Sequence, residues 1–258
     1  MRQHHRATIS LLAVLVLVSA CGGGGADDGG AASKVPDGAA PDDRAVTPGG
    51  DLVLALAEDA DVLDPSLGRT LVGREVFINF CEKLYDINGD LEVVPQLAAE
   101  LPETSPDGLT VKIRLRPDVT FNDGTPFDAA AVKISLDRHK SIKGSARKSE
   151  LASVAAVAVL DPSTVELTLS VPFAPLTGQL ADRAGMIMSP AQLKKLGDDF
   201  GSSPVCVGPF SFDSRQAGNS ITLRKSTEYY DADQVNLDTI TYRVITDGNV
   251  RLGQRPLR

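Results

Sequence analysis

Three histidines, three cysteines and one Ser-x-x-Lys sequence are the parts of this 258-residue chain whose chemistry could support catalysis or metal binding. A hydrolase needs a nucleophile with a base beside it, and a zinc site needs four closely spaced Cys, His or acidic ligands. His4 and His5 lie at the extreme N-terminus, which leaves His139 alone in the body of the chain. Cys81 and Cys206 are far apart in sequence. We therefore predict no metal site and no cofactor.

The sequence SARK at residues 145–148 has the Ser-x-x-Lys spacing of the acyl-enzyme motif of penicillin-binding proteins. The SDN and KTG sequences that complete that site are absent, as are a GxSxG elbow and a P-loop. His139 falls near the end of a predicted helix, on its exposed side and without an evident partner. We predict no catalytic residues, because an esterase or a transpeptidase would need a nucleophile paired with a base.

The N-terminus has the pattern of an export signal. Arg2 and Arg6 precede an apolar run over residues 9–18, which is shorter than the roughly 20 residues of a membrane span. A basic start followed by a short apolar run is typical of a signal peptide. Val18-Ser19-Ala20-Cys21 resembles the bacterial lipobox, so we expect a signal peptide over residues 1–20 and lipidation of Cys21. The alternative is an ordinary signal peptide with a chance cysteine.

Residues 21–49 are rich in Gly and Asp and contain no aromatic residue and no leucine. Such a segment cannot bury enough apolar surface to fold, so we expect a disordered tether. A Gly-rich coil of this length spans about 30 Å. The chain has 26 basic and 34 acidic residues, a net charge of −8, and losing Arg2 and Arg6 brings it to −10. An acidic chain without a basic stripe argues against nucleic-acid binding.

Two cysteines remain for the folded part. In an exported protein, Cys81 and Cys206 suggest one disulfide. This disulfide would close a loop of more than about a hundred residues. In the chain-entropy model it would add about 4–5 kcal/mol to the free energy of unfolding. Two buried free thiols are the alternative.

The predicted helices and strands, which must position the residues discussed above, follow one another along the chain without a regular order. We predict helices at residues 71–85, 129–139, 176–182 and 190–200, and a short strand and helix within 91–101. Strands are predicted at residues 50–57, 109–116, 185–188 and 239–245, with hairpins around 161–163 and 216–219 and a turn at 247–249. This mixture indicates layered α/β or α+β architecture.

Several short motifs stand in order along the folded part of the chain. They are Leu63-Asp64-Pro65; Pro95, Leu97 and Ala98; Ser105, Asp107, Gly108 and Thr110; Phe121 and Asp123 to Phe127; Ser135, Leu136 and Arg138; and Val205 to Phe212. With these motifs, above all those within residues 81–138, the chain resembles the family 5 extracellular solute-binding proteins of ABC transporters, which bind oligopeptides, dipeptides and nickel. Leu101 and Tyr230 stand where the family usually has a large aromatic residue, and Asn122 replaces a frequent histidine.

The resemblance implies a mixed α/β fold of the periplasmic-binding-protein type, cluster C, with two lobes that close on a ligand. Residues 50–252 correspond to the N-terminal part of the family domain, and residues 253–258 diverge from it. We therefore expect an incomplete lobe one with the second lobe missing, from truncation or a frame shift. Poor stability and impaired ligand capture should follow, because one wall of the cleft is absent. An independently folding half-protein is the alternative.

The resemblance also implies ligand-binding positions. It places Arg69 and Thr70 at the cleft, Arg183 toward the ligand and Gly208 where the chain returns to the main lobe. An arginine could hold a carboxylate through two hydrogen bonds, although either arginine could instead be solvated at the surface.

The implied function is the substrate-binding component of a peptide-type ABC importer, lipid-anchored to the outer face of the membrane on the periplasmic or extracellular side. Its partners would be a peptide or small solute and the permease subunits, with membrane contact through the lipid anchor only. Oligopeptides, dipeptides, nickel chelates and small sugars all stay open as ligands. A surface lipoprotein that mediates interactions without a transport ligand is the alternative function.

Overall fold

The computed structural model describes residues 46–253. The predicted signal peptide, the lipidation site Cys21, nearly all of the tether over residues 21–49 and residues 254–258 of the divergent tail lie outside the described residues.

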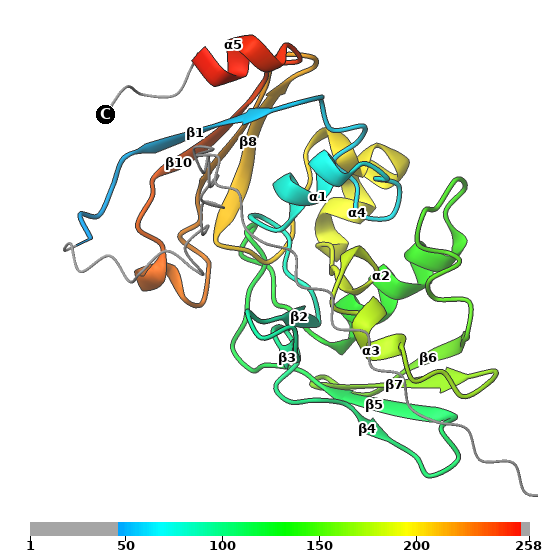
Figure 1. Cartoon of the computed structure of the whole chain (residues 1–258). Coiled ribbons are helices and arrows are strands. Elements are labelled where there is room, and N and C mark those ends of the chain that lie inside the picture. Colours follow the sequence, from blue (N-terminus) through cyan, green and yellow to red (C-terminus); the bar gives the residue numbers. More distant parts are fainter. Residues whose placement is uncertain (1–45, 254–258) are drawn as a thin grey trace, which may run out of the picture. The chain divides into compact units, whose positions relative to one another are not determined.

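One four-stranded sheet has the strand order β1-β10-β9-β8 (Figure 1). Its strands are β1 (Asp51–Leu56), β8 (Phe210–Gln216), β9 (Ser220–Lys225) and β10 (Thr239–Val244). β1 runs parallel to β10, with Asp51 opposite Thr239, although 188 positions separate these two residues. The predicted hairpin around residues 216–219 is confirmed as the antiparallel pair β8 and β9.

A second four-stranded sheet is antiparallel throughout, in the order β4-β5-β7-β6. Its strands are β4 (Glu103–Thr104), β5 (Thr110–Arg114), β6 (Val154–Asp161) and β7 (Thr164–Leu169), and a separate pair is formed by β2 (Tyr85–Ile87) and β3 (Val93–Pro95). The predicted hairpin around residues 161–163 is confirmed. Its turn is held by the Asp161 carboxylate, which accepts a hydrogen bond from the Ser163 amide at 2.8 Å.

The helices are α1 (Leu71–Phe77), α2 (Ala129–Ser141), α3 (Leu176–Gln179), α4 (Pro190–Leu196) and α5 (Gly248–Gly253). Asp128 caps α2, because its carboxylate accepts from the Ala131 amide at 2.9 Å. Ser189 caps α4 and Pro190 occupies its first turn, as predicted. α4 is shorter than the predicted helix, because a 3₁₀ helix (Gly197–Ser202) takes over at Gly197.

The predicted helix over residues 71–85 is wrong beyond α1. Phe80 and Leu84 are buried, as their four-residue spacing suggests, but the backbone there pairs with other segments. The Leu84 amide donates to Gly185 at 2.9 Å, and Lys83 forms a β-bridge with Met186. Tertiary pairing therefore overrides the helical pattern.

Three smaller predictions also differ from the structure. No helix follows β3, because Ala98 forms a β-bridge with Leu115. The segment over residues 185–188 is buried as expected, yet it makes isolated bridges rather than a strand. The predicted turn at 247–249 begins α5, since the Asp247 carboxylate accepts from the amides of Asn249 and Val250.

Two apolar clusters form the core. One contains residues of α2 and of the sheet β4-β5-β7-β6, and the other contains residues of α1, α4 and the sheet β1-β10-β9-β8. Met186 and Met188 belong to the second cluster, whereas Ile187 between them belongs to the first. This segment therefore joins the clusters by alternating its side chains, and the mixed α/β fold class is confirmed.

β6 is an edge strand whose outward carbonyls receive hydrogen bonds from lysines of α2. Lys133 Nζ donates to the Val157 carbonyl at 2.9 Å, and Lys140 Nζ donates to the Ala155 carbonyl at 3.3 Å. Charged side chains at a sheet edge discourage pairing with another chain. Within residues 46–253, no helix has both the length and the apolar character needed to cross a membrane.

Candidate functional site

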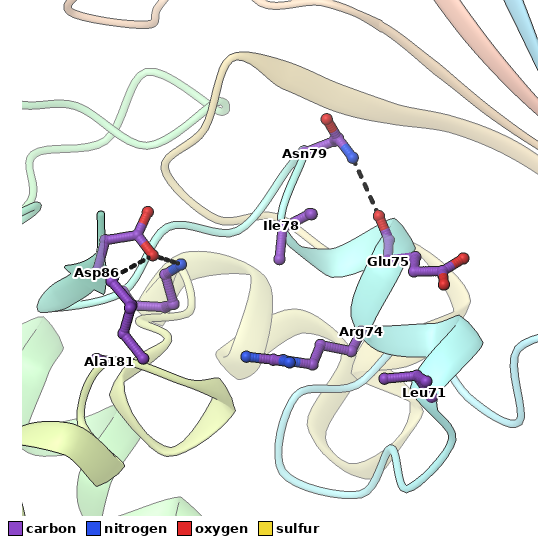
Figure 2. Close-up of a pocket in the computed structure, with 9 residues that line it drawn as sticks. Leu71, Arg74, Glu75, Ile78, Asn79, Asp86 and Ala181 are labelled. Atoms are coloured by element: carbon purple, nitrogen blue, oxygen red, sulfur yellow. Dashed lines mark hydrogen bonds and ion pairs between the residues drawn. The ribbon is translucent and has the colours of Figure 1, made fainter. Parts of the chain in front are cut away.

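A pocket of about 410 Å³ opens beside α1 (Figure 2). Three of its lining residues are large apolar side chains that stay exposed, namely Leu71 at 66%, Ile78 at 50% and Ile87 at 45%. Exposed apolar side chains grouped around a hollow are typical of a binding surface. The other lining residues are Arg74, Glu75, Asn79, Lys83, Asp86 and Ala181.

The N-terminal end of α1 is fixed by an acidic loop. Thr70 Oγ1 accepts from the Gly73 amide and donates to Asp61 Oδ1, each at 3.0 Å. The other Asp61 oxygen accepts from the Arg69 amide at 2.8 Å. Burial alone would raise the pKa of Asp61, but these hydrogen bonds to the charged form outweigh it and lower that pKa. Asp61 therefore stays ionised and holds the first turn that carries Leu71 and Arg74.

Two ion pairs arrange the charged wall of the pocket. Arg74 Nε lies 2.9 Å from Asp182 Oδ1, and Lys83 Nζ lies 2.6 Å from Asp86 Oδ1. The Lys83 side chain is only 8% exposed. Asp86 is also held by the Ile87 amide at 2.8 Å and by Gln96 Nε2 at 3.4 Å. The wall is therefore a set of oriented charges.

Three of the four predicted ligand-binding residues come together next to this pocket. Arg183 Nη1 donates to the carbonyls of Gly68 and Thr70, both at 3.1 Å. Arg69 Nη2 donates to the Gly144 carbonyl at 2.8 Å. Both guanidinium groups thus bind backbone, and neither arginine nor Thr70 is among the residues lining the pocket. Their role in binding a ligand stays a prediction.

Gly208, the fourth predicted residue, does not line the pocket and has a packing constraint. A Cβ atom at this position would stand 2.5 Å from the Phe80 carbonyl carbon. This close approach explains the glycine without a ligand.

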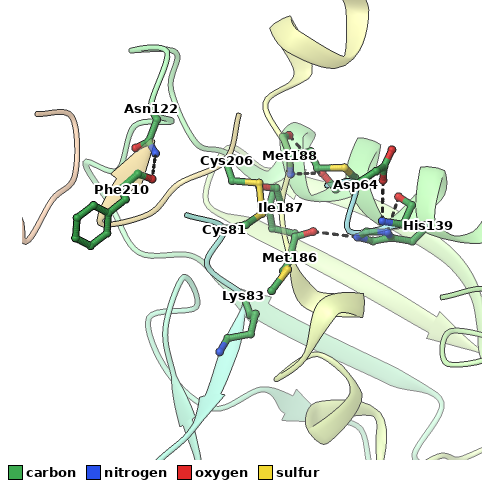
Figure 3. The surroundings of a disulfide bond; sticks show 12 residues. Asp64, Cys81, Lys83, Asn122, His139, Met186, Ile187, Met188, Cys206 and Phe210 are labelled. Carbon is green, nitrogen blue, oxygen red and sulfur yellow. Dashed lines mark hydrogen bonds between the residues drawn. A yellow bond between two sulfur atoms is a disulfide. The ribbon is translucent and has the colours of Figure 1, made fainter. Parts of the chain in front are cut away.

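A disulfide joins Cys81 to Cys206 across 125 positions, which is the first of the two alternatives left open by the sequence (Figure 3). The Asn122 amide donates to the Cys206 carbonyl at 2.9 Å, and Asn122 Nδ2 donates to Phe210 at 2.7 Å. The disulfide and Asn122 therefore fix the segment that leads from α1 into the pocket wall at Lys83.

The prediction that His139 is exposed and unpartnered is wrong. Its side chain is fully buried, and its Nδ1 lies 2.9 Å from Ser66 Oγ while its Nε2 lies 3.0 Å from the Met186 carbonyl. Nε2 must donate to that carbonyl, so a neutral ring accepts at Nδ1 from the Ser66 hydroxyl. Burial lowers the pKa of His139 to about 4. The last turns of α2 face the core here, which the sequence pattern does not reveal.

Ser66 and His139 resemble a nucleophile and base, but each has an exposure of 0%. Ser66 Oγ also accepts from Arg138 Nη1 at 2.7 Å, and Arg138 makes two hydrogen bonds to Asp64 at 2.9 and 2.7 Å. This buried network ties the loop before α1 to α2. A substrate has no access to the pair in this structure.

The Ser-x-x-Lys residues are used differently. The Ser145 hydroxyl donates to the His139 carbonyl and accepts from the Arg147 amide at 3.0 Å. Lys148 is exposed. Ser145 therefore stabilises the turn after α2, and its proton is not directed toward the lysine.

A buried acid that sequence reasoning missed lies next to the pocket wall. Glu82 is 4% exposed and accepts hydrogen bonds from Tyr229 Oη at 2.7 Å and Tyr230 Oη at 2.9 Å. Burial raises the pKa of Glu82. Arg116 stacks 4.6 Å from the Tyr230 ring centre. The only sequence signal was an acid within an apolar run, which does not name its partners.

No group of metal-ligating residues occurs in residues 46–253.

Comparisons with known proteins agree with this architecture. Residues 92–255 match the family described as bacterial extracellular solute-binding proteins, family 5 Middle. The glutathione-binding protein GsiB of Salmonella paratyphi A is 35% identical over 202 residues, which are 78% of this chain and 39% of that protein. The Escherichia coli K12 protein of the same name is 32% identical over the same length.

Solved structures of binding proteins share the fold of this chain. AgaA from A. tumefaciens R10, in complex with agropinic acid, is 33% identical with a TM-score of 0.74 over 79% of this chain and 41% of that one. Listeria monocytogenes OppA bound to peptide, at 23% identity and a TM-score of 0.73, shows the shared fold and is covered to 44%. The chain thus spans about two fifths of the length of these relatives. It belongs to the family 5 bacterial extracellular solute-binding proteins.

Proposed function

We propose that this chain captures a peptide or a related small solute and serves as the substrate-binding component of a peptide-type ABC import system. The observation that carries the proposal is the pocket beside α1, where exposed Leu71, Ile78 and Ile87 surround the charges of Arg74 and Lys83. Apolar walls with a few oriented polar groups are typical of small-molecule sites. Two relatives support the solute class, because one is named for glutathione and another was solved with agropinic acid.

We further propose that the protein is exported and tethered. Residues 1–20 would be the signal peptide, Cys21 the lipidated residue and residues 21–49 a tether, with residues 50–252 as part of the solute-binding domain. The permease subunits of the importer would be its partners on the outer face of the membrane. Growth with labelled palmitate tests the anchor. The wild-type protein should incorporate the label and Cys21→Ser should not, whereas a wild-type protein that incorporates no label would contradict the anchor.

We propose no catalytic activity. The arrangement that comes nearest to a catalytic pair, Ser66 with His139, has no exposed surface. The buried network around it explains both residues as structural.

Ligand-induced stabilisation tests solute binding. The melting temperature of the purified chain should rise when a tripeptide pool, glutathione or agropinic acid is added, because a ligand that binds the folded state stabilises it. Polyols added at the same concentration are the control for nonspecific effects on the melting temperature. No rise with any solute at millimolar concentration contradicts the proposal and favours an interaction module without a transport ligand.

A further inference from the structure

Two cations of the pocket wall have hydrogen-bond donors to spare. Arg74 uses Nε for Asp182, and its two Nη groups have no protein acceptor within residues 46–253. Lys83 Nζ can donate three hydrogen bonds, and Asp86 is its one protein acceptor in that same range. Arg74 and Lys83 both line the same pocket, and Figure 2 shows the Arg74 guanidinium extending into it. Unused donors of two cations thus face one hollow.

The nearby carboxylates leave these donors available. Asp86 already accepts from Lys83, from the Ile87 amide and from Gln96, and it makes no hydrogen bond to Arg74. The Glu75 carboxylate is turned away from the Arg74 guanidinium in Figure 2. An acceptor for the Nη groups of Arg74 must therefore come from solvent or from a ligand.

The environment of Lys83 strengthens such an interaction. Lys83 is only 8% exposed although it lines the pocket. Charges shielded from water interact more strongly than charges at the open surface. A guanidinium matches the two oxygens of a carboxylate in geometry, and an ammonium adds a compact charge beside them.

We infer that the pocket takes the carboxylate end of its solute between Arg74 and Lys83, with the adjoining apolar part of the solute against Leu71, Ile78 and Ile87. The inference rests on the proposed function and names its substrate class: amino-acid derivatives and short peptides with a free carboxylate. It differs from the expectation for Arg69 and Arg183, which donate hydrogen bonds to backbone carbonyls and do not line the pocket.

Paired probes that differ only in this carboxylate test the inference. Tri-alanine and its C-terminal amide, and N-acetylleucine and its amide, are titrated into the ¹⁵N-labelled 258-residue chain carrying Cys21→Ser, followed by NMR. The acids should shift amide signals of residues 71–87 and of Ala181, and should bind at least about tenfold more tightly than the amides.

Variants then assign the effect. Arg74→Gln and Lys83→Met should each lower the affinity for the acids by about tenfold and leave the affinity for the amides unchanged. Arg224→Gln is the matched control, because this arginine is paired with Asp213 on the sheet β1-β10-β9-β8, away from the pocket residues. Circular dichroism and melting temperature show that each variant is folded. If Lys83→Met does not fold, Lys83→Arg is the second variant. It keeps the positive charge and should bind the acids.

The outcomes separate the two claims. Equal affinity for acid and amide, signal shifts outside the pocket, or full acid binding by both variants would overturn the carboxylate site and leave solute capture intact. No signal shift with any probe, together with no stabilisation by the solutes named for the proposed function, would overturn both.

Discussion

Ser66 and His139 are hydrogen-bonded through Oγ and Nδ1 at 2.9 Å, across 73 positions of the sequence, and both are fully buried. The contact connects the loop that precedes α1 with the end of α2. It requires a neutral imidazole, because Nδ1 accepts and Nε2 donates to Met186. This requirement makes the stability of the fold sensitive to acid.

We expect the free energy of unfolding to fall as the pH drops from about 6.5 to about 4. The pKa of His139 is about 4 in the fold, against 6.5 as its ordinary value. Between these values the unfolded chain binds more protons, so acid favours unfolding, and the full effect reaches about 3 kcal/mol. Above pH 6.5 this contribution is constant. Urea titrations at pH 7 and pH 5 measure it. The pH-dependent difference should shrink in His139→Gln, and an unchanged difference would contradict the assignment.

The buried pair of Asp64 with Arg138 should be costly to break. Their side chains are 1% and 13% exposed, and removing one partner leaves a buried charge uncompensated. Asp64→Asn should therefore lower the free energy of unfolding by about 3–5 kcal/mol. Asp213→Asn, which removes the partner of the exposed Arg224, should change the melting temperature little. Equal losses in the two variants would show that burial does not decide the effect.

The disulfide should stabilise the fold mainly through the unfolded state. Because Cys81 and Cys206 are 125 positions apart, reduction should cost about 4–5 kcal/mol. Guanidinium unfolding with and without reductant measures this in protein carrying Cys21→Ser. The double variant Cys81→Ala and Cys206→Ala should be destabilised to a similar degree and should no longer respond to reductant. A response that persists would point to another target.

Gly208→Ala should be destabilising by about 1–3 kcal/mol, because the added methyl group overlaps the Phe80 backbone. Gly178→Ala is the matched control, since a Cβ there meets no atom within 4 Å. Thermal melts compare the two. A Gly208→Ala protein that melts like wild type and loses only solute binding would support the ligand role that the family resemblance implies.

Lys133 and Lys140 should keep the edge of β6 from pairing with a second molecule. Replacing both with Met removes two charged groups from that edge, and we expect concentration-dependent self-association. Lys195→Met on α4 controls for the loss of surface charge. Sedimentation velocity distinguishes the proteins, and a monomeric double variant would contradict this role.

Local signals in the sequence predicted much of the fold. The turn residues at 161–163 and 216–219 lie in real hairpins, and the caps Asp128 and Ser189 begin real helices. These features depend on hydrogen bonds between residues a few positions apart, and such bonds are specified by residue type.

The features that sequence missed depend on distant partners. Phe80 and Leu84 have helical spacing, but the segment around them pairs with Met186 and the chain beside Cys206. His139 reads as a surface residue until Ser66 and Met186 are placed against it. The same holds for the pocket. Arg74 and Lys83 line one pocket because a disulfide and a β-bridge, neither of them local, position Lys83.

The parallel pairing of β1 with β10 also sets an order of events during synthesis. β1 has β10 as its sheet neighbour, and at about 5–20 residues per second the 188 positions between Asp51 and Thr239 take about 10–40 s to emerge. Throughout that interval the nascent β1, with Val53 exposed even in the finished sheet, waits without its strand partner. The sheet β1-β10-β9-β8 therefore cannot be complete before β10 is available, and a chaperone that shields β1 during synthesis or export would act before that point.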